Sequence, residues 1–266
     1  MIVLMDVGNT RIKLGWWDAQ QGREPEVQAF ALSDTAGSLT ERLSQWLSLH
    51  ASPWEAAIGV NVAGQDVAVQ IEQALSARSC PVRWMRPGAS MLGMTNRYEQ
   101  PAQLGADRWA ALLGVSGRYP ANDKPIILAT FGTATTIDTL APGAVFEGGM
   151  ILPGPALMRS SLARGTANLP HVLGDGHAFP RNTAAAISTG VLSAQSGALW
   201  RQCRVVKEAY GTWPHVCVSG GAWPEVQSEV LAGMASLQID VEHLSHPALD
   251  GLARLAQTMT NPETGA

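Results

Sequence analysis

The chain begins with Met1-Ile2-Val3-Leu4-Met5-Asp6-Val7-Gly8-Asn9-Thr10-Arg11-Ile12-Lys13-Leu14-Gly15-Trp16, and this stretch decides the fold. Residues 2–7 form an apolar run of the length of a buried strand, and residues 8–10 have the composition of a turn. Residues 11–16 alternate between polar and apolar side chains, which predicts a returning strand. Together the three parts predict a β-hairpin with a polar tip.

A second hairpin of the same kind is predicted near the middle of the chain. Residues 125–131 form another apolar strand, 132–134 (Gly-Thr-Ala) a turn and 135–140 a returning strand. Superposing Gly8 on Gly132 places Asn9 over Thr133 and Asp6 over Thr130. A duplicated unit is the simplest explanation.

The composition is that of a packed globular enzyme. The chain has 266 residues, of which 46% are apolar and 15% charged, so two modest α/β domains can each bury a core. The net charge of -4 and the lack of a dense run of Lys and Arg disfavour a nucleic-acid partner.

The remaining bulk features concern cysteines and membranes. Cys80, Cys203 and Cys217 are far apart and form no C-x-x-C spacing, so the sequence indicates neither a disulfide framework nor a zinc site. The N-terminus lacks a basic region, and no stretch approaches the length of a membrane span. We therefore expect a cytoplasmic protein without a membrane partner.

Helices and strands alternate between and after the two hairpins, as in a mixed sheet flanked by helices. We predict helices at 39–50, 67–78, 104–115, 183–210 and 249–259, strands at 56–62, 81–85 and 216–218, and a Gly/Pro-rich loop at 148–155. The long helix from Thr183 has an apolar face at Ile187, Val191, Ala194, Ala198 and Val205. A linker at 117–123 divides the chain into domains 1–117 and 118–266.

The first hairpin has the residues of a phosphate-binding turn. Gly8 allows the backbone close to an anion, and Asn9, Thr10 and Lys13 offer donors. Asp6, at the end of the strand, suits the hydrated Mg²⁺ that accompanies ATP. Taken alone, the same residues also fit an ordinary hairpin with a solvated tip. Two Gly/Thr turns can hold the β- and γ-phosphates from both sides of a cleft between similar halves.

A third candidate lies between the hairpins. Residues 105–108 (Gly-Ala-Asp-Arg) place Asp107 and Arg108 in the first turn of a predicted helix. Asp107 can be simply a partner of the helix dipole. Near a phosphate-binding site Asp107 can instead orient a substrate hydroxyl for in-line attack, while Arg108 or the N-terminus of the helix receives an anionic substrate. Residues 219–221 (Ser-Gly-Gly) suit either an adenosine or a tight turn.

These pieces occur in an order that resembles the type III pantothenate kinase family, including its members called Bvg accessory factor. They are D-x-G-N-T at 6–10, the segment 105–108, G-T-A-x-T at 132–136, G-G-x-I-x-P-G at 148–154, Asn182-Thr183, 219–221 and L-D-G-L at 249–252. The resemblance implies two ribonuclease-H-like domains of the acetate and sugar kinase, Hsp70 and actin superfold. It also implies a homodimer that converts ATP and pantothenate into ADP and 4′-phosphopantothenate, the first step toward coenzyme A.

The resemblance also implies roles for single residues. The groups that bind ATP are Asp6, Val7, Gly8, Asn9, Thr10, Arg11, Ile12, Lys13 and Thr133. The groups that bind pantothenate are Tyr98, Gly105, Ala106, Asp107, Arg108 and Thr183, the last acting from the partner subunit. By the same resemblance Asp107 would be the catalytic residue, and we expect it to act on the pantothenate hydroxyl mainly by positioning it.

The sequence departs from the family at one position. The family usually has Asp where this chain has Thr130, and that carboxylate helps to hold an activating potassium or ammonium ion. Thr130 cannot supply the charge, and backbone carbonyls would bind the ion more weakly, so potassium dependence stays open and no protein residue is assigned as a secure metal ligand. Mg²⁺ is expected with ATP.

Two rival interpretations remain open from the sequence. The first is a different small-metabolite kinase of the same fold, because fold does not determine substrate. The second is a regulatory protein that activates transcription. The acidic balance and the lack of a recognisable helix-turn-helix argue against direct DNA contact.

Overall fold

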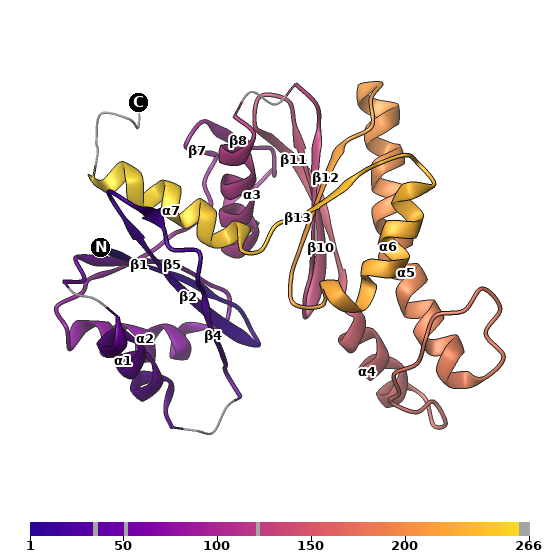
Figure 1. Cartoon of the computed structure of the whole chain (residues 1–266), viewed down its shortest axis with the longest axis horizontal. Coiled ribbons are helices and arrows are strands. Elements are labelled where there is room, and N and C mark those ends of the chain that lie inside the picture. The colour runs from indigo at the N-terminus through magenta and orange to yellow at the C-terminus, as the bar shows by residue number, and fades with distance from the viewer. Residues whose placement is uncertain (34–36, 51–52, 121–122, 261–266) are drawn as a thin grey trace. The chain divides into compact units, whose positions relative to one another are not determined.

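The computed structural model describes residues 1–33, 37–50, 53–120 and 123–260, and Figure 1 shows its elements. The chain forms two compact units, one of Met1–Pro120 with His246–Ala266 and one of Ala121–Ser245. The sequence places the domain boundary at residue 118 and the whole rest of the chain in the second domain. In the structure, the closing helix belongs to the first unit instead. The predicted linker begins inside a helix that continues to Arg118, and residues 121–122 lie outside the described part.

The first unit consists of strands and helices that follow one another along the chain. Its elements are β1 (Ile2–Val7), β2 (Arg11–Asp18), β3 (Gly22–Arg23), β4 (Gln28–Ala31), α1 (Leu39–Leu49), β5 (Ala56–Asn61), α2 (Gln65–Ser76), β6 (Val82–Trp84), β7 (Ser90–Met91), β8 (Met94–Asn96), a 3₁₀ turn (Pro101–Gln103), α3 (Ala106–Arg118) and α7 (Pro247–Thr260).

Strand β1 is the centre of the first sheet. It pairs antiparallel with β2 and parallel with β5, in the order β3-β2-β1-β5-β6, and β4 pairs with β2. Every residue of β1 is buried, as its apolar run predicts for a central strand. Val3, Met5 and Val7 pack against α1 and α2, while α3 and α7 cover the other face (Figure 1). Because side chains alternate along a strand, Asp6 lies on the α3 and α7 face.

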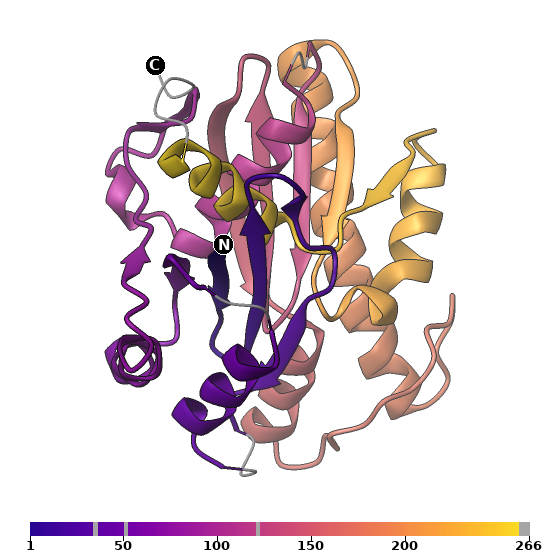
Figure 2. The ribbon, with the colours of Figure 1, turned by 60° about the vertical axis from the view of Figure 1, so that its left-hand side comes forward.

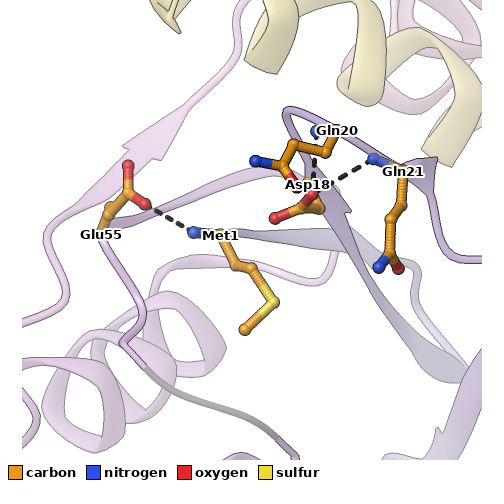
Figure 3. Close-up of polar contacts among 5 residues, drawn as sticks. All are labelled: Met1, Asp18, Gln20, Gln21 and Glu55. Atoms are coloured by element: carbon orange, nitrogen blue, oxygen red, sulfur yellow. Dashed lines mark hydrogen bonds and ion pairs between the residues drawn. The ribbon is translucent and has the colours of Figure 1, made fainter.

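Three polar contacts lie at the outer ends of the first hairpin (Figure 3). The amino group of Met1 donates to Oε1 of Glu55 at 2.7 Å, which joins the start of β1 to the start of its parallel neighbour β5. At the far end of β2, Oδ1 of Asp18 accepts the backbone N–H groups of Gln20 at 2.9 Å and Gln21 at 3.2 Å. These bonds close the turn that leads into β3.

Helices α3 and α7 approach each other backbone to backbone. A Cβ atom on Gly114 would overlap the carbonyl oxygen of Pro247, and one on Gly251 would overlap that of Ala110. Glycine is needed at both positions because no side chain fits. Arg254 of α7 also donates to the carbonyl oxygen of Leu113.

The second unit repeats the sheet of the first. Its elements are β9 (Ile126–Phe131), β10 (Ala134–Ala141), β11 (Val145–Pro153), α4 (Pro155–Gly165), α5 (Thr183–Tyr210), β12 (His215–Ser219), α6 (Trp223–Ala235) and β13 (Val241–His243). Its strands run in the order β11-β10-β9-β12-β13, with β9 antiparallel to β10 and parallel to β12. In each unit a hairpin is thus followed by parallel strands on the same side, as the duplication predicts.

Helices α5 and α6 lie side by side on one face of this sheet (Figures 1 and 2). The buried face of α5 differs from the predicted one, because Ala194 and Val205 are exposed. Side chains four residues apart from Ile187 to Cys203 form the buried stripe instead, and Gln195 is among them. No helix in the described part of the chain combines the length and the apolarity that crossing a membrane requires.

The Gly/Pro-rich loop predicted at 148–155 is wrong, because residues up to Pro153 belong to β11. Gly148 and Gly149 pair with Thr139 and Asp138 of β10, and the register shifts after Thr139. Glycine weakens a strand locally but is well suited to such a bulge. Pairing with β10 therefore overrides the local preference.

Replacing Gly251 by Ala tests the close helix contact. We expect Gly251→Ala to lower the free energy of unfolding by about 1–3 kcal/mol or more, because α7 must move away from α3. The control is Gly233→Ala in α6, where a Cβ meets nothing within 4 Å. That change should raise the free energy by up to about 1 kcal/mol, since Ala is the better helix former. Denaturant unfolding of both variants measures the difference, and equal effects would contradict the contact.

Candidate functional site

The tip of the first hairpin presents only part of the predicted phosphate-binding stretch. The side chains of Val7 and Ile12 are buried in the core, so these residues can offer only backbone groups. The backbone N–H of Gly8 donates to the carbonyl oxygen of Arg11 at 3.0 Å and closes the turn. Asn9, Thr10 and Arg11 are exposed. The side chains of these three residues are therefore open to a ligand at the tip of the hairpin.

Asp6 and Lys13 form an ion pair behind this tip. They lie opposite each other in the β1–β2 register, and Nζ of Lys13 donates to Oδ2 of Asp6 at 2.9 Å. Asp6 is only 8% exposed, whereas the Lys13 side chain is about one-third exposed. The lysine therefore compensates the charge of a buried carboxylate, and its exposed end can still face an anion. A buried carboxylate beside a turn is also an oxygen ligand of the type that Mg²⁺ prefers.

The start of α3 holds Asp107 in a defined position. Its Oδ1 accepts the backbone N–H of Arg108 at 2.8 Å. The preceding Gly105 has no side chain, and a Cβ there would approach Oδ1 of Asp107 to 2.7 Å. The glycine in this segment therefore leaves room for the Asp107 carboxylate.

Arg108 is buried and turned toward Tyr98. Its Nη1 donates to the Tyr98 hydroxyl at 3.1 Å, and its guanidinium carbon lies 5.8 Å from the centre of the tyrosine ring. The backbone N–H of Tyr98 donates to Oδ1 of Asn96 at 3.0 Å, which holds the tyrosine in turn. The first unit thus brings Tyr98, Arg108 and Asp107 together, although ten residues separate the tyrosine from the arginine.

Burial raises the pKa of Asp107 above its ordinary value of 3.8. The N–H of Arg108 acts in the opposite direction, and the negative charge of Asp6 raises the pKa further. The carboxylate beside the first hairpin therefore acts electrostatically on the one at the start of α3. Perturbed pKa values cluster at functional sites, so the raised pKa of Asp107 makes this carboxylate a candidate for catalysis.

His246 is a neighbour that the sequence did not reveal. It precedes α7, and its Nδ1 is buried with no hydrogen-bond partner among the described residues. Burial lowers the pKa of His246, and the positive charges of Lys13 and Arg23 lower it further. The folded environment therefore favours the neutral form of the imidazole. No local motif marks this histidine, because only the return of α7 brings it there.

Three glycine turns of the second unit meet at the end of β9. A Cβ on Gly154 would overlap the carbonyl oxygen of Gly132, and one on Gly220 would overlap the backbone of Phe131. Gly220 also has a φ of +101°, which favours glycine. The turns at 132–134, 154 and 219–221, predicted separately, therefore form one surface of closely packed backbone.

Gln195 of α5 holds two of these segments in place through its buried side chain. Its Oε1 accepts the hydroxyl of Thr135 at 2.6 Å, and its Nε2 donates to the carbonyl oxygen of Pro153 at 2.9 Å. The side chain is fully buried, so both bonds are strong constraints on the second hairpin. A glutamine in the apolar stripe of α5 was the signal that could have identified it.

Thr133 and Thr183 also belong to the second unit. Thr133 is exposed at the tip of its hairpin. Thr183 is the first residue of α5, after Asn182, whose side chain caps the helix by accepting the N–H of Ala185 at 2.8 Å. It lines a cavity of about 750 Å³ with residues of α4 and α5.

The pKa of Asp107 predicts how stability depends on pH. A raised pKa means that the folded protein binds the proton more tightly, so stability is lost as the pH rises from about 3.8 through the folded pKa. Asp107→Asn removes this penalty. We expect the variant to have a higher Tm than the wild type at pH 7 and a shrinking advantage toward pH 4. Thermal unfolding across this range measures it, and a variant less stable at every pH would contradict the assignment.

Comparison with known proteins identifies the family. A family model described as type III pantothenate kinase matches residues 2–205. A type III pantothenate kinase of Bordetella petrii is 47% identical over 262 residues, covering 96% of this chain and 97% of the relative, and one of Aromatoleum aromaticum is 38% identical over 257 residues, covering 97% and 98%.

A solved structure supports the fold. A Listeria monocytogenes protein, assigned as an N-acetylmannosamine kinase, has a TM-score of 0.56 at 14% identity and covers 98% of this chain and 99% of its own. At this identity the likeness concerns the fold alone, which is that of the sugar kinase and actin superfold, with two similar α/β sheets. From the family model and the near-full-length relatives, the chain belongs to the type III pantothenate kinase family.

Proposed function

We propose that this protein transfers the γ-phosphoryl group of ATP to the hydroxyl of pantothenate, and that Asp107 positions this hydroxyl. The reaction is that of the family, and the observation that supports the residue assignment is Asp107 itself. Its carboxylate is held by the N–H of Arg108 at the start of α3, and burial raises its pKa.

The exposed groups of the two hairpins would bind the phosphates of ATP. Gly8 to Arg11 supply the tip of the first hairpin, and Thr133 supplies the tip of the second. Asp6 would hold the hydrated Mg²⁺, which neutralises charge on the phosphates when bound. Lys13 keeps the Asp6 carboxylate in place through their 2.9 Å contact.

The pantothenate would lie against Tyr98 and the segment 105–108. Pantothenate is an anion, and the buried Arg108 is the cation of this group. The Tyr98 hydroxyl orients the guanidinium through their hydrogen bond. In a loose phosphoryl-transfer transition state little proton is removed early, so Asp107 acts mainly by aligning the hydroxyl.

The proposal includes a cytoplasmic homodimer in which Thr183 contacts the pantothenate of the partner subunit. Thr183 is exposed at the start of α5 and lines a cavity there, which supports this role.

Replacing Asp107 by Asn tests the catalytic assignment. We expect turnover to fall by about 100-fold or more with ATP affinity nearly unchanged, because a neutral amide aligns the pantothenate hydroxyl less well than the carboxylate does. The matched control is Asp66→Asn, an exposed acid in the first turn of α2. That variant should keep full turnover.

Mass-spectrometric detection of 4′-phosphopantothenate gives the rates. Equal rates for wild type and Asp107→Asn would remove Asp107 from the mechanism. A folded wild type that makes no product from ATP, Mg²⁺ and pantothenate would overturn the proposed function.

Thr130 leads to a separate proposal about the monovalent cation. It pairs with Thr136 of β10 and Ser219 of β12, so three neutral hydroxyl residues lie side by side where the family usually has a carboxylate. A cation bound there would lack its compensating charge, and we propose that potassium binds weakly.

Thr130→Asp should therefore lower the potassium concentration needed for half-maximal activity by about tenfold or more, since one charge contact in a partly buried site exceeds 1 kcal/mol. Activity is titrated with potassium chloride at constant ionic strength, with a bulky organic cation as the replacement salt. The same half-maximal concentration in both proteins would contradict the proposal.

A further inference from the structure

The second unit contains a group of three metal-ligating side chains that no step of the proposed reaction uses. His215 and Cys217 belong to β12, and Glu242 belongs to β13. Their ligand atoms all lie within 4.8 Å of one another. Neither the spacing of the cysteines nor any local motif indicated this group, because it forms only when the two strands pair.

The strand register explains the arrangement. Residues two apart on a strand point to the same face of a sheet, so His215 and Cys217 are neighbours on one face. Glu242 lies directly opposite Cys217 in the parallel pairing of β12 with β13. The group therefore depends on a short stretch of one sheet within one unit.

The distances suit a tetrahedral ion of the zinc class. Zinc binds Cys sulfur at about 2.3 Å and His nitrogen or carboxylate oxygen at about 2.0–2.2 Å, which places ligand atoms about 3.4–3.6 Å apart. Nε2 of His215 already lies 3.1 Å from Oε2 of Glu242. Small side-chain rotations can bring all three ligand atoms into this range.

The exposure of the three side chains and the chemical type of their ligand atoms also favour an ion of the zinc class. Cys217 is fully buried, whereas the side chains of His215 and Glu242 are 36% and 32% exposed. An ion can thus enter from the side of the histidine and the carboxylate and keep water as its fourth ligand. A set of one sulfur, one nitrogen and one oxygen favours zinc over magnesium, which prefers oxygen ligands only.

We propose that His215, Cys217 and Glu242 form a binding site for a divalent ion of the zinc class. Binding replaces water molecules of the ion by the three side chains, and the Cys217 thiol releases its proton to solvent as the metal–sulfur bond forms.

A metal ion bound at this site would link the edge strand β13 to β12. β13 lies at the end of the sheet order and pairs with β12 at only three positions (Figure 2). An ion held from both strands links β13 to the rest of the sheet. Bound metal should therefore raise the thermal stability of the folded protein.

Titration of the full-length, metal-free protein with Co²⁺ and Zn²⁺ tests the proposal. We expect one ion per chain, an absorption band from sulfur bonded to cobalt, displacement of cobalt by zinc, and no competition from excess Mg²⁺. Cys217→Ser should abolish the sulfur band. Glu242→Gln and His215→Gln, which change partly exposed side chains, should each weaken zinc binding by about 100-fold or more.

Cys203→Ala is the control for unspecific thiol binding. Cys203 is a buried cysteine of the same unit, and burial raises the pKa of its thiol to about 12. This variant should bind cobalt and zinc as the wild type does. Failure of the wild type to bind, unchanged binding in Glu242→Gln and His215→Gln, or loss of the band only in Cys203→Ala would each overturn the site.

Discussion

Helices α3 and α7 can touch backbone to backbone because Gly114 and Gly251 leave no side chain between them, and much of the first unit depends on this contact. It brings the end of the chain back onto the face of the sheet that carries Asp6. The same contact places His246, the residue before α7, near Lys13. This face of the sheet is therefore assembled from both ends of the sequence.

Close backbone contacts in the second unit likewise depend on glycines, which here lie at turns. Gly154 and Gly220 allow three chain segments to converge on the end of β9, and Gln195 fixes the hairpin beneath them through two buried hydrogen bonds. A backbone surface held in this way needs little rearrangement when a charged ligand binds, which favours an ATP-dependent kinase. The two units thus share a sheet order while differing in the residue at the strand end, Asp6 in one and Thr130 in the other.

Because of that difference, the first hairpin carries a charged pair where the second carries two neutral side chains. Asp6 is buried and is compensated by Lys13 across the β1–β2 pair. At the corresponding place Thr130 pairs with Thr136, and neither side chain carries a charge. The duplicated architecture is therefore electrostatically asymmetric, with the carboxylates that would serve catalysis, Asp6 and Asp107, both in the first unit.

The sequence by itself determined the two hairpins, the duplicated α/β class, the family and most helices, because continuous apolar strands, glycine turns and helical periodicity are local signals. It also singled out Asp107, although not the burial that gives this residue its raised pKa. Only the tertiary structure decided that residues 148–153 pair as a strand, that α7 joins the first unit, and that Gln195, His246 and the group at Cys217 gain partners or neighbours. Each of these depends on contacts between segments distant in the chain, and such contacts leave no periodic pattern in the sequence.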